Sequence, residues 1–180
     1  MMNTQRLVIA GFGGQGVLTI GQLMAMLGMK RNYAVSWMPS YGPEMRGGTA
    51  NCHVVIDEKE VDSPLIASNI SVLVALNQPA LDKFKSMLAS DAIIIRHSAL
   101  THNFDLKDQQ KDVAMDFSAI ATQFNSTKSL NMAVFGALVK HLDVYSYEEG
   151  KAVIEEKLGH KNESLLKVNL EVYTYAYQLK

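Results

Sequence analysis

The sequence of 180 residues contains a single cysteine, Cys52. A lone thiol cannot form an internal disulfide, a cysteine-rich zinc site or a four-cysteine iron–sulfur cluster. We therefore expect the chain to hold no redox centre of its own through these ligands. Cys52 falls on the apolar side of an alternating segment, which predicts a packed core thiol rather than a reactive one.

The sequence also lacks a surplus of charge and any long hydrophobic run. Lys and Arg number 17 against 18 Asp and Glu, and the net charge is −1, which argues against nucleic-acid or anionic-membrane partners. Near the start, only residues 7–10 are apolar before glycines interrupt, too short for a secretory signal. No stretch reaches the roughly 18 apolar residues of a membrane span. We expect a cytoplasmic protein.

Hydrophobic residues make up 48% of the chain and charged residues 19%, a composition that can build a buried core. The length suits a single domain over residues 1–180. The apolar patterns predict strands at 6–10, 33–38, 49–57, 71–76, 92–95 and 113–117, and helices at 15–30 and 79–90. After residue 131 the pattern is helical, with breaks near 143–147 and 159–161. The alternation predicts a Rossmann-like, doubly wound α/β fold with a mostly parallel sheet, helices on both faces and a C-terminal helical segment.

A glycine-rich turn follows the first predicted strand. Gly11, Gly13, Gly14, Gln15 and Gly16 lie in a G-x-G-x-x-G pattern that opens the first predicted helix. Glycines allow positive φ angles and close backbone approach, and the amides of the helix start can bind an anion. A dinucleotide site also needs an acid about 20 residues on, which the end of the second strand (36–39) lacks. The missing acid favours tight packing, another phosphate or a neighbouring chain as the role of the turn, and a bound dinucleotide is the alternative.

A second loop, residues 39–48, carries two prolines and three glycines and is predicted to be irregular. Its candidate binding residues are Tyr41, Glu44, Arg46, Gly47 and Gly48. A fixed arginine beside exposed amides can bind a carboxylate or phosphate bidentately. Pairing of Arg46 with Glu44, or with another subunit, is the alternative.

Histidines offer weaker candidates. His53 lies on the more polar side of the predicted strand 49–57, and we expect it to be exposed to solvent. His97 and Ser98 follow a predicted strand, a common place for a ligand contact. No acid is positioned to orient His97, so no catalytic residue is assigned. No metal ligands are assigned either.

Together the two loops resemble one family. Residues 11–17 (GFGGQGV) and 40–51 (SYGPEMRGGTAN) are similar to the gamma subunit of 2-oxoacid:ferredoxin oxidoreductases. Further matches lie at 62–64, 131–132, 136–138 and 169–171. Tyr175 and Tyr177 depart from the family, whose last helix often carries a glycine. The form of the second loop resembles the 2-oxoglutarate and branched-chain 2-oxoacid (ketoisovalerate) branch more than the pyruvate branch.

The resemblance implies a role in a larger enzyme. In this family a 2-oxoacid and coenzyme A give an acyl-CoA and CO2 while ferredoxin is reduced. Thiamine diphosphate and Mg²⁺ lie between alpha and beta subunits, and iron–sulfur clusters lie in beta and delta chains. The gamma chain helps form the coenzyme A region, where the candidate residues of both loops would hold a phosphate or brace closing loops.

The isolated chain is expected to be inactive and could form a homodimer. The alternative is a stand-alone Rossmann-type nucleotide-binding domain or small dehydrogenase.

Overall fold

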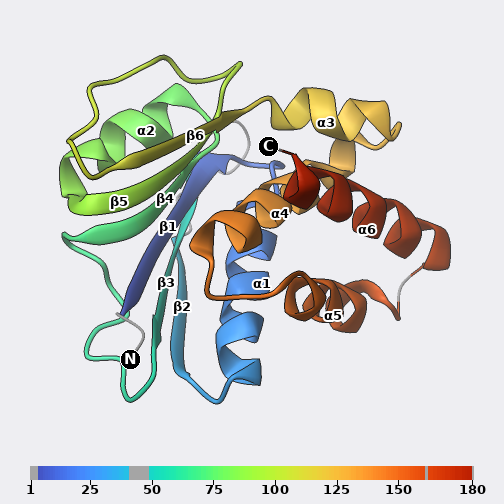
Figure 1. The fold of residues 1–180 in the computed structure, drawn as a ribbon, viewed down its shortest axis with the longest axis horizontal. Coiled ribbons are helices and arrows are strands. Elements are labelled where there is room, and N and C mark those ends of the chain that lie inside the picture. The colour runs from blue at the N-terminus through green and yellow to red at the C-terminus, as the bar shows by residue number, and fades with distance from the viewer. Residues whose placement is uncertain (1–3, 41–48, 161, 180) are drawn as a thin grey trace. The chain divides into compact units, whose positions relative to one another are not determined.

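The computed structural model describes residues 4–40, 49–160 and 162–179. Its contacts divide the chain into two compact units, Met1–Met115 and Asp116–Lys180. The first unit holds the sheet and the second holds helices (Figure 1). Each unit is described by itself below. Among the described residues, no helix is long and apolar enough to cross a membrane.

A six-stranded sheet organises the first unit, in the order β2-β3-β1-β4-β5-β6. The strands are β1 (Gln5–Phe12), β2 (Ala34–Ser40), β3 (Thr49–Asp57), β4 (Ile70–Ala75), β5 (Leu88–His97) and β6 (Lys111–Met115). β3 runs antiparallel to both of its neighbours, whereas β1, β4, β5 and β6 pair in parallel. The prediction of a mostly parallel sheet is confirmed.

Helices cover both faces of this sheet. α1 (Val17–Lys30) packs so closely on one face that a side chain at Gly28 would collide with Val35 and Ile56. α2 (Gln78–Phe84) packs on the other face, where its buried residues share one apolar cluster with Val8 and Leu73. Successive strand residues point to opposite faces, so β1 and β4 are buried from both sides. Their nearly continuous apolar sequences follow from this position.

The second unit is helical, as predicted for the C-terminal segment. It contains α3 (Phe117–Gln123), a 3₁₀ turn η2 (Thr127–Ser129), α4 (Leu130–Leu142), α5 (Tyr147–Leu158) and α6 (Glu163–Gln178). Ser146 and Glu149 form a reciprocal capping box at the start of α5, and Asn162 caps α6. α5 begins at the last residue of the first predicted break and α6 begins just after the second, and these caps explain both starts.

Aromatic packing accounts for the two tyrosines that depart from the family. Tyr177 packs against Tyr147 and Tyr173, whose ring centroids lie 5.3 and 6.2 Å away. Tyr175 meets Phe124 edge-on at 5.5 Å. Both rings therefore fill space between helices of this unit.

Several predicted boundaries are wrong, and the strand predicted at 92–95 is longer, Leu88–His97. The helix predicted at 79–90 ends at Phe84, and after a short 3₁₀ turn η1 (Lys85–Met87) the chain enters β5 at Leu88, which pairs with Ile70. The strand predicted at 113–117 stops at Met115, because Asp116 caps α3. β2 continues through Pro39, opposite Cys52. A proline fits there because β2 is the edge strand of the sheet.

Candidate functional site

The sheet changes winding direction between β1 and β4. These strands are parallel neighbours, and the chain leaves β1 for α1 on one face but leaves β4 for α2 on the other. At such a switch point the two connections diverge and open a crevice beyond the carboxyl ends of the strands. The glycine turn lies at this end of β1, so the sequence placed it where open α/β sheets bind ligands.

Left-handed backbone shapes the glycine turn. Gly14 has a φ of 95° and Gly16 a φ of 76°, values that side chains with a Cβ rarely adopt. Gly16 is the N-cap residue of α1, and no side chain caps this helix end. The amides of the first turn of α1 have no partner within the helix and carry its positive dipole end. The turn can therefore bind an anion or an acceptor atom.

Gln15 braces the turn. Its Oε1 accepts from Phe12 N at 2.6 Å and its Nε2 donates to Leu76 O at 3.2 Å, which joins the turn to the end of β4. The brace lies so close that a Cβ on Gly11 would stand 2.5 Å from Gln15 Oε1. The structure thus gives Gln15 and Gly11 packing roles, and direct ligand contact by either stays a prediction.

Asn77 is a candidate site residue that sequence reasoning missed. It lies two residues after the end of β4, is fully buried, and its Oδ1 accepts from Ala80 N at 2.8 Å at the start of α2. Among the described residues, nothing accepts from its Nδ2. A buried amide left unsatisfied costs about 1–3 kcal/mol, so this Nδ2 is a donor that a further acceptor would satisfy. An Asn after an apolar run and before Gln78 and Pro79 was the available sequence signal.

The position of β3 bears on the dinucleotide interpretation. In the dinucleotide-binding fold, a parallel strand beside β1 brings the ribose-binding acid to the ligand edge. Here the neighbour is antiparallel β3, whose beginning pairs with the end of β1, Phe12 opposite Thr49 and Gly11 opposite Ala50. The strand neighbouring β1 therefore brings no acid to this edge, which agrees with the absence of an acid at 36–39.

Residues 41–48, most of the second predicted loop, lie outside the described residues, and residues 39–40 belong to β2. Tyr41, Glu44, Arg46, Gly47 and Gly48 lie outside the described residues. β2 and β3 flank this loop, and its two ends meet where Ser40 pairs with Asn51.

The prediction for His53 was wrong. Its side chain is only 7% exposed, and its Nδ1 accepts from Ile66 N at 3.0 Å. The ring meets Phe84 edge-on, beneath α2 and the segment that precedes β4. Burial first, and the charge of Lys83 second, lower the pKa of His53. The polar-looking face of β3 is therefore interior, because α2 and this segment cover it.

Two other candidates are buried as well. Cys52 is inaccessible and its Sγ lies 3.6 Å from Val17 O, which confirms the predicted core thiol. Burial raises the pKa of this thiol to about 12. His97 is 1% exposed at the end of β5, whereas Ser98 is exposed. Within the described ranges no group of three His, Cys, Asp or Glu side chains is arranged to hold a metal ion.

A family model described as pyruvate ferredoxin/flavodoxin oxidoreductase matches residues 6–179. The chain belongs to this family. The match spans both units and confirms the resemblance carried by the two loops. The similarity to this family therefore extends over most of the chain and is not limited to the glycine motif.

Two relatives illustrate the match. The chain is 38% identical over 134 residues to the ketoisovalerate oxidoreductase subunit VorA of Methanothermobacter marburgensis, which covers 74% of this chain but 28% of that relative. It is 31% identical over 159 residues to the 2-oxoglutarate synthase subunit KorC of the same organism, covering 83% of this chain and 84% of the relative. The chain thus spans little more than a quarter of VorA but most of KorC.

Two solved structures share the fold. The gamma subunit of a keto/oxoacid ferredoxin oxidoreductase from Geobacter sulfurreducens gives a TM-score of 0.80 at 22% identity, covering 97% of this chain and 96% of that one. The 2-oxoglutarate:ferredoxin oxidoreductase of Magnetococcus marinus, solved with 2-oxoglutarate, coenzyme A and succinyl-CoA bound, gives 0.86 at 22% identity. That match covers 98% of this chain and 31% of the larger one.

Proposed function

We propose that the chain is the gamma-type subunit of a multi-subunit 2-oxoacid:ferredoxin oxidoreductase. The alignment with KorC carries this proposal, because it covers most of both chains and KorC is itself a separate subunit by name. The similar extent of the Geobacter sulfurreducens gamma subunit supports the same division into subunits.

The proposed reaction joins a 2-oxoacid to coenzyme A. The carboxyl group leaves as CO2, the acyl group forms a thioester, and two electrons pass to ferredoxin. Thiamine diphosphate with Mg²⁺ and the iron–sulfur clusters belong to alpha, beta and delta partners in a cytoplasmic complex. A chain with one buried cysteine suits a subunit that carries no cluster. The names of its relatives favour 2-oxoglutarate or a branched-chain 2-oxoacid as substrate.

The chain itself would contribute to the coenzyme A side of the site. The backbone amides of the first turn of α1, which follow Gly13, Gly14 and Gly16 in the sequence, can donate to a phosphate oxygen. Asn77 supplies a buried Nδ2 donor at the neighbouring strand end. Arg46, with Tyr41, Glu44, Gly47 and Gly48 around it in sequence, would add a bidentate phosphate contact or brace the loop. A phosphate site of this kind would make the chain necessary for coenzyme A binding. The chain would still not catalyse the reaction alone, because the cofactors belong to its partners.

Co-purification tests the subunit assignment. An affinity-tagged copy expressed in its native host should recover thiamine diphosphate- and cluster-containing chains with 2-oxoacid- and coenzyme A-dependent ferredoxin reduction. A lone chain carrying a bound nicotinamide dinucleotide would contradict the assignment and favour the stand-alone nucleotide-binding alternative.

Steady-state kinetics of the assembled complex test the coenzyme A role. Arg46→Ala should raise the apparent KM for coenzyme A about tenfold, the loss of one charge-assisted contact, with a smaller effect on the KM for the 2-oxoacid. Arg31→Ala is the matched control, because Arg31 caps the opposite end of α1. If Arg46→Ala changes only subunit assembly, the residue acts at an interface and the ligand role is wrong.

A further inference from the structure

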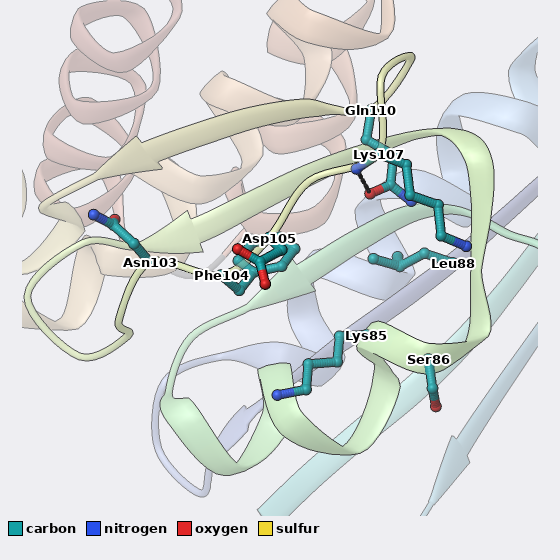
Figure 2. A pocket seen from close by; sticks show the side chains of 8 residues that line it. All are labelled: Lys85, Ser86, Leu88, Asn103, Phe104, Asp105, Lys107 and Gln110. Carbon is teal, nitrogen blue, oxygen red and sulfur yellow. Dashed lines mark hydrogen bonds between the residues drawn. The ribbon is translucent and has the colours of Figure 1, made fainter.

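The first unit contains a cavity that the proposed function does not use. Its volume is about 460 Å³, a size typical of small-molecule sites. The walls come from η1, the first residue of β5 and the irregular loop 98–110 between β5 and β6 (Figure 2). η1 and Leu88 lie where β5 begins, at the end of the strand opposite the glycine turn, and Asn103 is bonded to Arg96 near the other end of β5.

Arg96 holds one side of this loop. The side chain is 6% exposed, and its Nε and Nη2 each donate to the Asp112 carboxylate at 2.8 Å, joining β5 to β6. The remaining donors reach the loop itself, Nη1 to Thr101 Oγ1 at 3.2 Å and Nη2 to Asn103 Oδ1 at 3.0 Å. A guanidinium with fixed planar geometry therefore sets the position of Asn103 in the cavity wall.

Gln110 holds the other side. Its Oε1 accepts from Lys107 N at 3.1 Å, the dashed line in Figure 2, and its Nε2 donates to Ala89 O at 2.8 Å. A third tie runs from His102 N to Gln78 Oε1 at 2.7 Å. Long loops without regular structure are uncommon in compact domains unless they serve a function. This one is fastened at several points, so the cavity is formed before any ligand arrives.

Most polar side chains of the lining carry hydrogen-bond donors. They include the Lys107 ammonium group, the Ser86 hydroxyl and the Asn103 NH2 group, and the Asn103 Oδ1 already accepts from Arg96. Lys85 adds a second ammonium, shared with Asp82 at 2.7 Å outside the cavity lining. Asp105 is the one carboxylate of the lining. With two cationic groups and two neutral donors against one carboxylate, the lining favours an anionic ligand.

Apolar groups complete the lining. Leu88 is buried, and Phe104 packs partly against the apolar core beneath the loop. An apolar surface beside hydrogen-bond donors favours a ligand that has an apolar body and an anionic group. We propose that this cavity binds a small organic anion, a carboxylate or phosphate ester with an apolar or planar body. The site lies within the first unit and does not depend on the proposed function.

Titration of the full-length chain with phenyl phosphate, followed by backbone amide NMR, tests the proposal. We expect saturable shifts of the Asn103, Lys107 and Gln110 amides with a Kd of about 1 mM or lower. Inorganic phosphate should bind about tenfold more weakly, because it cannot contact Leu88 and Phe104. Phenol should also bind weakly, because it lacks the anionic group.

Variants at exposed positions supply the control. Lys107→Ala should weaken phenyl phosphate binding about tenfold, whereas Lys111→Ala, which removes a nearby exposed charge outside the cavity, should change it less than twofold. Equal binding of inorganic and phenyl phosphate would overturn the proposed ligand class. An unchanged affinity in Lys107→Ala, or no saturable shifts, would overturn the site itself. Each result leaves the subunit assignment unaffected, since the isolated chain is used.

Discussion

At the scale of single residues, Gly16 shows how backbone conformation restricts the glycine turn. With a φ of 76° and a ψ of 21°, it occupies the left-handed region. Gly16→Ala should lower the free energy of unfolding by about 1 kcal/mol, because a Cβ clashes with the backbone there. Gly16→Asn should cost less, since Asn tolerates this conformation and caps helices. Urea denaturation measures both, and equal stability of the alanine variant and the parent would contradict the assignment of strain.

The buried His53 makes the folding stability of the chain depend on pH. The pKa of His53 is lower in the folded chain than its value of about 6.5 in the unfolded chain. As the pH falls, the unfolded chain therefore binds a proton at this residue before the folded chain does. Stability should therefore fall as pH drops from about 6.5 through the folded pKa. The lowered pKa values of Asp57 and Asp82 act in the same direction only below about pH 4.

Urea midpoints between about pH 7.5 and pH 5 measure this effect. His53→Gln keeps an acceptor for Ile66 N but does not titrate, so its midpoint should fall less over the same interval. Parallel curves for the two proteins would show that His53 is not responsible.

At the scale of elements, the Arg96–Asp112 pair joins β5, β6 and the loop between them. The two side chains are 6% and 20% exposed, so removing one leaves the other charge poorly solvated. Arg96→Met should destabilise the chain by about 3 kcal/mol. The double variant Arg96→Met/Asp112→Leu should recover part of that loss, because it removes both charges.

A double-mutant cycle in urea separates these contributions. The recovery is expected in global stability but not in hydrogen-exchange protection of residues 101–103, which lose their anchor in both variants. Full additivity of the two single substitutions would contradict a coupled pair.

For some helices and strands, local sequence patterns are enough to predict the bounds. β1, α1 and β3 were predicted close to their observed bounds, because glycines limit β1 and strong apolar periodicity fixes the others. The error at Phe84 arose where tertiary pairing competes with local propensity, whereas the error at Met115 came from a local helix cap, Asp116, that was not recognised. Leu88 joins β5 because Ile70 pairs with it, and that partner is distant in sequence.

At the scale of the whole molecule, the contacts divide the chain after Met115, whereas the family match runs from residue 6 to 179. We predict that the chain unfolds as a single domain. A helical unit of the size of residues 116–180 alone buries too little surface for high stability. Differential scanning calorimetry should therefore give one transition with equal calorimetric and van't Hoff enthalpies. Two separable transitions would show that the units fold independently.

The sequence by itself determined the fold class, the glycine turn and the family. Apolar periodicity, glycine spacing and the two loop motifs are local properties that survive without coordinates. The sequence also indicated that Cys52 belongs to the core, since its strand alternates.

Only the tertiary structure decided which faces of the strands are buried. His53 and Asn77 look like surface residues in sequence, yet α2 and the neighbouring loops bury both. The donor-lined cavity at loop 98–110 also depends on contacts between residues far apart, such as Gln110 with Ala89. Burial and polar satisfaction are set by segments that meet across the fold, so no local pattern predicts them.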